Sequence, residues 1–205
     1  MVFDPSALTL LAITDDLRDG RDGLVARAAA AVRGGATMVQ LRLKDEDART
    51  LAEVARALVA ALPVPVTVND RVDVALAVGA AGAHLGVDDL PVRAARRIVP
   101  PGFVLGASLG ADAELARVAG ADYVGIGPVY ETSSKADAGS AIGVAEFARL
   151  MRAAGLPAVA IGGITPANAA ALFAAGAAGV AVIRAVLGSS DPEAAARALR
   201  SASGR

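Results

Sequence analysis

The segment from Ala153 to Ile183, AAGLPAVAIGGITPANAAALFAAGAAGVAVI, carries no charged residue. Its length would suit a membrane-spanning helix. Turn and helix-cap signals interrupt it, however, at Pro157, at Gly162–Gly163 and at Thr165–Pro166. The segment therefore predicts a strand, a loop, a helix and a second strand, all buried inside a soluble fold.

The same alternation of a short apolar run and an Ala-rich helical segment recurs along the whole chain. Uninterrupted apolar runs indicate strands buried on both faces, as in a parallel sheet. Eight such units with no long linker favour a closed barrel over an open sheet. We predict an α/β fold, a compact (β/α)8 TIM barrel, as a single domain over residues 1–205. Strands are expected at 8–14, 38–43, 66–69, 83–85, 104–108, 123–127, 158–161 and 179–183. Helices are expected near 22–34, 46–61, 71–79, 91–98, 112–119, 144–154, 166–175 and 191–202.

The composition excludes several classes of function. With 55% hydrophobic residues the chain can bury a core, and with a net charge of −1 it lacks the basic surplus of a nucleic-acid binder. It has no Cys and one His, which excludes thiol chemistry and His-rich zinc sites. The N-terminus shows no leader, so we expect a cytoplasmic protein without a membrane partner. Of its 20 basic residues only two are Lys, Lys44 and Lys135.

The first of these lysines ends a strand with a strict two-residue period. Catalytic groups of such barrels lie at the C-terminal ends of the strands. In the run Met38–Lys44, the residues Gln40, Arg42 and Lys44 share one face, and the alternate apolar residues share the other. Basic groups that face a barrel interior are costly unless they meet an anion. This strand end therefore predicts an anion site.

Carboxylates follow the next two strands. Asp70 ends one, and Asp88 and Asp89 follow the other, so that a pair of them could hold Mg²⁺ or could cap the helices that come next. Spacing alone leaves this choice open. His84 favours a core histidine over a catalyst, and Ser108 is equally consistent with a helix cap and with a ligand contact.

The last three strand ends predict a second anion site. The loop at 129–139 carries several hydroxyl groups, which suit phosphate oxygens, and its Lys135 is expected to join Arg42 and Lys44 at the first site. Gly162–Gly163 precede a helix, where backbone N–H groups can approach an anion. The loops after strands seven and eight are a recurrent phosphate site in barrels.

Five motifs in this order resemble those of the thiamine phosphate synthase family, over nearly the whole chain. They are Gln40-x-Arg42-x-Lys44, Asn69-Asp70-Arg71, His84-Leu-Gly86-x-x-Asp89, Gly127-Pro128-x-Tyr-x-Thr132-x-Ser134-Lys135 and Ile161-Gly-Gly-Ile164. The resemblance implies a transferase of thiamine biosynthesis. It would couple hydroxymethylpyrimidine diphosphate to a thiazole phosphate with Mg²⁺, releasing pyrophosphate by dissociation and forming thiamine phosphate.

The resemblance also implies roles for individual residues. Asp70 and Asp89 would bind the metal, and Arg42, Lys44 and Lys135 would be catalytic through their charge. The pyrimidine diphosphate would contact Gln40, Arg42, Lys44, Asn69, Ser108 and Lys135. The thiazole phosphate would contact Thr132, Ser134, Gly162, Gly163, Ile183 and Arg184.

Four positions depart from the family pattern: Val87, Glu131, Ser134 and Arg184 stand where Gln, Pro, Thr and Ser are usual.

The alternatives are a thiazole tautomerase, a Schiff-base aldolase using Lys44 or Lys135, and a non-catalytic barrel that binds thiazole phosphate. The tautomerase group tends to lack the two metal aspartates. The expected partners are small molecules, and the oligomeric state, a homo-oligomer included, stays open.

Overall fold

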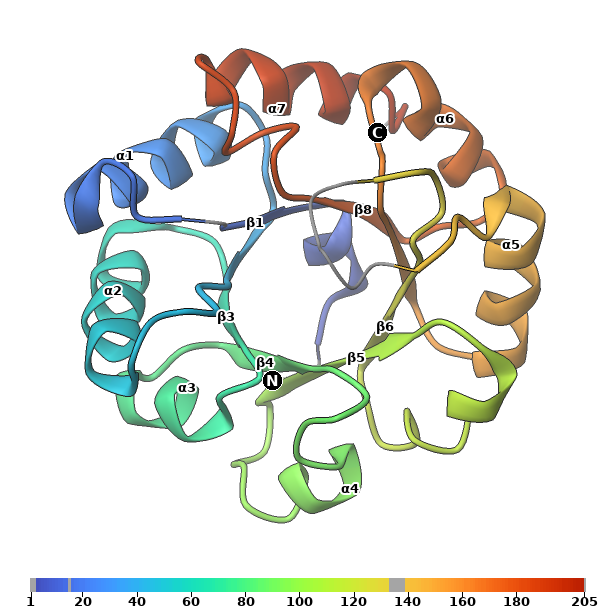
Figure 1. Ribbon diagram of the computed structural model, residues 1–205, viewed down its shortest axis with the longest axis horizontal. Coiled ribbons are helices and arrows are strands. Elements are labelled where there is room, and N and C mark those ends of the chain that lie inside the picture. The colour runs from blue at the N-terminus through green and yellow to red at the C-terminus, as the bar shows by residue number, and fades with distance from the viewer. Residues whose placement is uncertain (1–2, 15, 133–138, 205) are drawn as a thin grey trace.

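Eight parallel strands close into a barrel in chain order, with a ring of helices outside it (Figure 1). The computed structural model describes residues 3–14, 16–132 and 139–204. The predicted (β/α)8 class is therefore confirmed. The strands are β1 Leu10–Ile13, β2 Met38–Leu41, β3 Val66–Asn69, β4 Gly82–Leu85, β5 Val104–Leu109, β6 Tyr123–Ile126, β7 Ala158–Ile161 and β8 Gly179–Val182.

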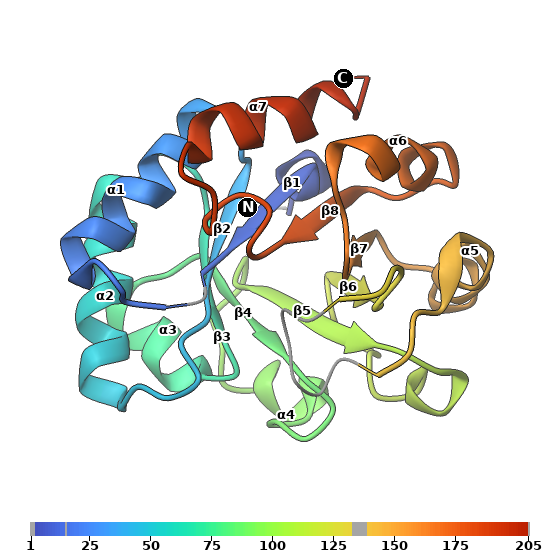
Figure 2. The ribbon, with the colours of Figure 1, turned by 45° about the horizontal axis from the view of Figure 1, so that its top comes forward.

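Seven α-helices and two 3₁₀ helices precede, connect or follow the strands in the described part of the chain. They are α1 Gly20–Arg33, α2 Ala48–Ala61, α3 Val72–Val78, α4 Val92–Ala95, α5 Gly143–Ala154, α6 Pro166–Ala174, α7 Pro192–Ser201, η1 Pro5–Leu8 and η2 Asp112–Glu114. Helix α7 returns beside α1, which closes the outer ring (Figure 2).

Two predicted helices are wrong in extent. The helix expected at 91–98 is only the short α4, and the one expected at 112–119 is reduced to η2 and the turns after it. The second segment offers a helix only two core-facing apolar residues, Leu115 and Val118. A helix that buries so little apolar surface gains little from tertiary packing, which supplies most helical stability in proteins.

The uncharged segment that suggested a membrane helix folds as its turn signals predict. It supplies β7, α6 and β8, and Asn168 closes the start of α6 by accepting a hydrogen bond from the N–H of Thr165 at 2.8 Å. Among the helices that the structure describes, none is long and apolar enough to cross a membrane.

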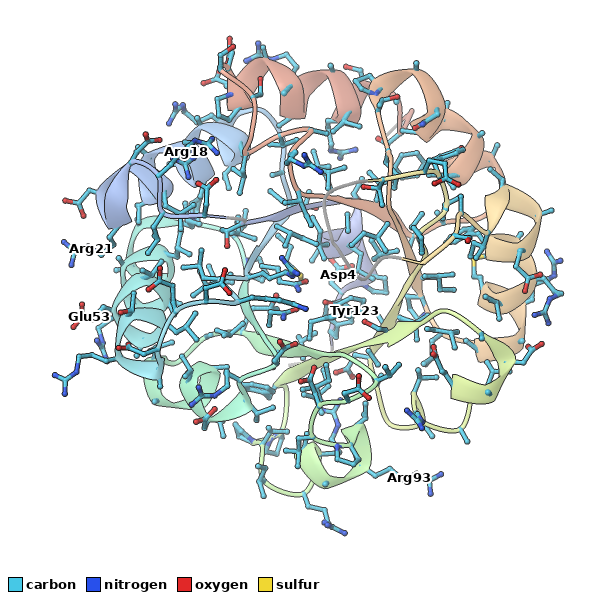
Figure 3. All side chains as sticks on the ribbon, viewed as in Figure 1. Asp4, Arg18, Arg21, Glu53, Arg93 and Tyr123 are labelled. Atoms are coloured by element: carbon cyan, nitrogen blue, oxygen red, sulfur yellow. The ribbon has the colours of Figure 1, made fainter. Side chains whose placement is uncertain are left out.

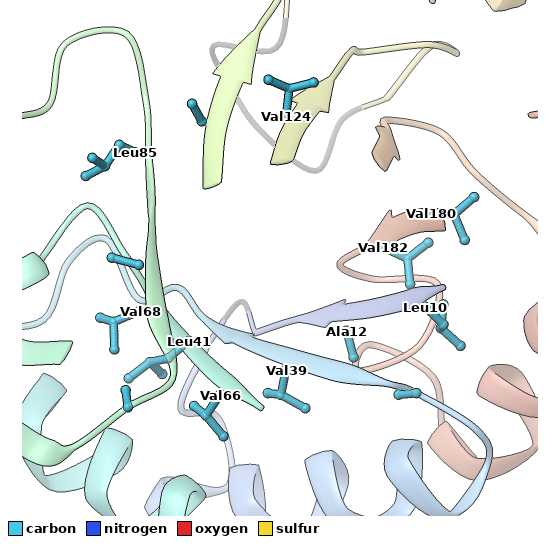
Figure 4. Packing of buried hydrophobic residues seen from close by; sticks show 14 of the residues in the cluster. Leu10, Ala12, Val39, Leu41, Val66, Val68, Leu85, Val124, Val180 and Val182 are labelled. Atoms are coloured by element: carbon cyan, nitrogen blue, oxygen red, sulfur yellow. The ribbon is translucent and has the colours of Figure 1, made fainter. Parts of the chain in front are cut away.

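The main core lies between the strands and the helices. Helix α2 shows how it is built: Asp47 caps its start, and Leu51, Val54 and Leu58 repeat at helical spacing on its buried face. These side chains meet the outward residues of the strands, and Figure 4 shows Val39 and Val66 pointing toward the helices. Burying a side chain of this size contributes roughly 1.5–3 kcal/mol.

A second, smaller core fills the barrel interior. It contains Leu11, Met38, Tyr123 and Val159, and Leu8 of η1 packs into it from the N-terminal side. Phe3 stacks on Tyr123 with ring centroids 6.2 Å apart. The N-terminal end of the barrel is therefore plugged with apolar side chains, which leaves the opposite mouth for polar ones.

The close contact between Gly179, at the start of β8, and the backbone just before β1 predicts an effect on stability. A Cβ on Gly179 would overlap the carbonyl oxygen of Leu8, which is backbone and cannot swing away. We expect Gly179→Ala to lower the free energy of unfolding by more than about 3 kcal/mol, measured by urea denaturation. Gly79→Ala is the control, because Gly79 has φ +69° but open space around it and should cost only about 1 kcal/mol. Equal losses in the two variants would contradict the steric explanation.

Candidate active site

The predicted division of β2 into two faces is confirmed. Val39, Leu41 and Leu43 belong to the core under the helices. Gln40 is 3% exposed on the interior side, and its Nε2 donates to Oδ1 of Asn69 at 2.8 Å. This bond joins the ends of β2 and β3 and orients both amides at the barrel mouth.

Arg42 extends beyond the last ladder residue of β2, and a buried threonine holds it there. The backbone N–H of Arg42 donates to Oγ1 of Thr14 at 2.8 Å, and the same hydroxyl donates to the carbonyl of Arg42 at 3.1 Å. Arg42 is half-buried, whereas Lys44 is exposed at the rim. The positive charges of both residues act on the carboxyl group of Asp70.

Asp70 has an unusual backbone for a residue with a side chain. Its φ is +64°, in the left-handed region that Asp tolerates better than most residues. Its N–H donates to the carbonyl of His84 at 2.8 Å, which ties this turn to β4. Left-handed residues outside glycine concentrate at functional sites, since the surrounding structure must enforce them.

The carboxyl group of Asp70 meets that of Asp89. Burial raises the pKa of Asp70 from its ordinary value of 3.8 to about 6, helped by the hydrogen bond that protonated Asp70 donates to Asp89 and by repulsion from Asp89, although Lys44 and Arg42 oppose the shift. Asp89 is held by its own loop, where its Oδ2 accepts from the N–H of Gly86 at 2.6 Å. Asp88, which spacing left as an alternative, is exposed.

This carboxyl pair fits a divalent cation. Two half-buried carboxylates in contact repel each other when ionised, and a cation between them removes that repulsion. Mg²⁺ is usually held by one or two carboxylates and completes its shell with water and substrate phosphate. Among the described residues there is no group of three or more acidic, His or Cys side chains that could hold a metal ion, so a cation at Asp70 and Asp89 would need water or substrate for the rest of its shell.

Lys44, Asn69 and Asp70 line a hollow of about 270 Å³ on the β2–β3 side of the mouth. A second cavity, of about 260 Å³, lies at the ends of β5 to β8. Six residues predicted to contact substrate line this second cavity: Ser108, Thr132, Gly162, Gly163, Ile183 and Arg184. Asp89 lies in a third hollow, of about 440 Å³, which Ser108 also lines.

Backbone conformation and packing explain why positions 162 and 163 are both glycine. Both have positive φ, +99° and +63°, and a Cβ on Gly162 would lie 2.5 Å from Cβ of Pro128. The loop after β6 lies on these glycines and bonds to them, since the N–H of Tyr130 donates to the carbonyl of Gly162 at 3.1 Å. The two glycines thus present only backbone atoms to the cavity.

Two predicted residues of the loop after β6 cannot be placed. Ser134 and Lys135 fall in 133–138, outside the described residues. Thr132, just before this segment, is half-buried and lines the second cavity.

Sequence reasoning missed two residues near the site. Tyr123 approaches His84 in the barrel interior, with its Oη 3.2 Å from Nδ1 of the imidazole. Glu114 lines the second cavity and accepts from the N–H of Gly110 at 2.6 Å. The available signal for Tyr123 was the glycine at 106 on the neighbouring strand, which leaves room for a ring.

Comparison with known proteins agrees with this geometry. Residues 10–186 match the family described as thiamine monophosphate synthase. The chain is 49% identical over 192 residues to the thiamine-phosphate synthase of Roseiflexus castenholzii, covering 91% of this chain and 84% of the relative. It is 53% identical over 181 residues to that of Methanoculleus marisnigri, covering 86% and 85%. It resembles the solved thiamine phosphate pyrophosphorylase of Pyrococcus furiosus with a TM-score of 0.86 and 35% identity, covering 98% and 97%.

The carboxyl pair predicts a pH effect on stability. Because Asp70 binds its proton more tightly in the fold (pKa about 6) than in the unfolded chain (about 3.8), its contribution to the free energy of unfolding falls as pH rises from about 4 through 6. Asp70→Asn removes this charge and keeps a residue that tolerates positive φ. In EDTA at pH 7.5 we expect the variant to melt roughly 2–4 °C higher.

Thermal melts between pH 4 and 7.5 check this expectation. The difference between variant and wild type should close as pH falls below about 4, where Asp70 is protonated in both states. A difference that does not change with pH would contradict the assignment of the raised pKa to Asp70.

Proposed function

The chain belongs to the thiamine monophosphate synthase family, and from this premise we propose how its own residues carry out the reaction. The enzyme is a transferase of thiamine biosynthesis that joins hydroxymethylpyrimidine diphosphate to a thiazole phosphate, giving thiamine phosphate and pyrophosphate. The observation that carries the proposal is the pairing of a basic and acidic hollow with a second, largely uncharged cavity at one barrel mouth.

The proposed reaction is dissociative and needs charge stabilisation more than proton transfer. The bond between the pyrimidine methylene carbon and the diphosphate oxygen breaks, and its electron pair leaves with pyrophosphate. The electron-rich ring delocalises the resulting cation until the thiazole nitrogen attacks the methylene carbon. This forms a thiazolium without loss of a proton, so the site needs no strong general base, which agrees with a chain holding one His and no Cys.

Arg42 and Lys44 are proposed to bind the diphosphate and to stabilise the charge that develops on it as the bond breaks. Lys135 is proposed to join them from the loop after β6. The joined amides of Gln40 and Asn69 would orient the pyrimidine diphosphate at the ends of β2 and β3. Ser108 would contact it from β5, since it lines the hollow that also contains Asp89, the carboxyl partner of Asp70.

Asp70 and Asp89 are proposed to hold Mg²⁺. When bound, the cation would supply positive charge next to the departing pyrophosphate. Support comes from the contact between the two carboxyl groups and from the raised pKa of Asp70, both of which a divalent cation would offset.

The cavity of about 260 Å³ is proposed to take the thiazole phosphate. Thr132 and Ser134 would donate hydroxyl hydrogen bonds to the phosphate, and Gly162, Gly163 and Ile183 would line its site with backbone atoms. Arg184 would add a positive charge where the family usually has Ser. The cavity would also place the thiazole nitrogen for attack and exclude water.

The alternatives receive less support. The relatives described above are named synthases or pyrophosphorylase, and the carboxyl pair that a tautomerase would not need is intact. A Schiff-base aldolase needs a desolvated lysine, whereas Lys44 is exposed. A binding protein without turnover would not need basic groups and a carboxyl pair at the same barrel mouth.

The metal assignment predicts that Asp70→Asn lowers coupling roughly 100-fold or more. The assay supplies both substrates with and without Mg²⁺ and measures thiamine phosphate. A second readout is the rise in melting temperature caused by Mg²⁺ alone, which the variant should lose. Asp88→Asn is the matched control, because Asp88 is an exposed neighbour of Asp89. Full activity in Asp70→Asn, or an equal loss in Asp88→Asn, would overturn the assignment.

The second cavity predicts a separate effect on the other substrate. We expect Arg184→Ala to raise KM for the thiazole phosphate about 10-fold, as for loss of a charge-assisted hydrogen bond, and to leave KM for the pyrimidine diphosphate unchanged. Arg152→Ala, an exposed arginine on α5, is the control. Steady-state kinetics with each substrate varied in turn checks this, and an unchanged thiazole KM would remove Arg184 from the site.

A further inference from the structure

The one histidine of the chain lies between two hydroxyl groups inside the barrel. Nδ1 of His84 is 3.2 Å from Oη of Tyr123, and Nε2 is 3.1 Å from Oγ of Ser108. The three side chains come from β4, β5 and β6. Figure 3 shows Tyr123 near the centre of the ring of strands.

The fold reserves space for this arrangement. A Cβ on Gly106 would lie 2.5 Å from Oη of Tyr123 and 2.6 Å from Nδ1 of His84. A Cβ on Gly125 would lie 3.1 Å from Cε1 of the same imidazole. Glycine at 106 on β5 is therefore required for the two rings to meet, and glycine at 125 on β6 leaves room for the imidazole, so the contact depends on three strands at once.

The buried phenol determines the direction of the hydrogen bonds. Tyr123 is fully buried, and this burial raises its pKa, so the hydroxyl keeps its proton. Within the described part of the chain, Nδ1 of His84 is the hydroxyl's one hydrogen-bond partner. If Nδ1 carried a proton and donated it, the phenol proton would be buried without an acceptor, at the cost of an unmade hydrogen bond.

The tautomer of His84 determines which way the hydrogen bond to Ser108 runs. With Nδ1 accepting from Tyr123, a neutral imidazole carries its proton on Nε2 and donates it to Oγ of Ser108. The hydroxyl of Ser108 then accepts a hydrogen bond from Nε2 of His84, so its own proton points away from the imidazole. Ser108 lines the cavity of about 260 Å³ and also a hollow of about 440 Å³ that contains Asp89, so that proton can point into the mouth of the barrel beside the carboxyl pair.

We propose that Tyr123 and His84 are positioning residues, which make Ser108 a hydrogen-bond donor to a phosphate oxygen of the pyrimidine diphosphate. Phosphate oxygens accept and do not donate, so a serine whose proton was turned toward His84 would meet the diphosphate with its lone pairs. The two hydrogen bonds from Tyr123 to His84 and from His84 to Ser108, which together we call the relay, exclude that orientation. This inference rests on the proposed contact between Ser108 and the diphosphate, but the imidazole tautomer can be measured without substrate.

The first experiment is a long-range ¹H–¹⁵N NMR spectrum of the ¹⁵N-labelled protein at pH 7.5. The chain has one His, so both ring nitrogens are assigned without ambiguity. We expect the neutral tautomer protonated on Nε2 in the wild type, and a mixture of tautomers in Tyr123→Phe, which keeps the ring and removes the hydroxyl. A dominant Nδ1–H tautomer or an imidazolium in the wild type would overturn the proposal.

The second experiment is a double-mutant cycle on the coupling reaction. Tyr123→Phe should lower kcat/KM for the pyrimidine diphosphate about 3- to 10-fold, as for one misdirected hydrogen bond, and leave KM for the thiazole phosphate unchanged. In a Ser108→Ala background the same substitution should have no further effect. In a Ser108→Thr background, which restores a hydroxyl, the effect should return.

The outcomes test the relay and the contact between Ser108 and the diphosphate separately. Additive losses in the cycle would overturn the relay, even if Ser108 contributes to catalysis. Full activity in Ser108→Ala would overturn the contact with the diphosphate and with it the purpose of the relay, whatever the spectrum shows. Absence of coupling in the wild type would refute the proposed function, whereas the tautomer would still be decided by NMR. Thermal melts of each variant confirm that it is folded.

Discussion

In a closed barrel of parallel strands, side chains alternate between the helices and the interior, so strands of four residues leave about two interior positions each. The organisation of this protein depends on that constraint. Apolar residues take the outward positions, as with Val39 and Leu41. The interior is filled from the N-terminal side by a small apolar core, and the remaining interior positions near the strand ends are available for Gln40, His84 and Ser108.

Electrostatics at the mouth follows from the same geometry. A net charge of −1 suggests little electrostatic function, but the barrel gathers Arg42, Lys44, Asp70 and Asp89 at the ends of three neighbouring strands. Burial and the contact with Asp89 outweigh the two cations, because the pKa of Asp70 is raised to about 6. The left-handed backbone at Asp70 shows that the surrounding structure enforces this placement.

Prediction from the sequence succeeded where one element's own pattern carries the information. The two-residue period of 38–44 separated the faces of β2 correctly, and the turn signals within 153–183 resolved an uncharged run into β7, α6 and β8. It was wrong at 112–119, because a run compatible with a helix had too little apolar surface to be stabilised by packing. The roles of the site residues, among them Lys135 outside the described residues, stay predictions.

The sequence by itself determined the number, order and buried faces of the strands, because periodicity and turn residues act within a few positions of the chain. Its motifs were also sufficient to identify the family. The motifs also implied Asp89 rather than Asp88 as a metal ligand, but only the tertiary structure decided that its carboxyl group meets Asp70 and that His84 lies between Tyr123 and Ser108. These contacts depend on the register between strands, which pairs Asn69 with His84 and His84 with Gly106. Register arises from closing the whole barrel, so no local stretch of sequence contains it.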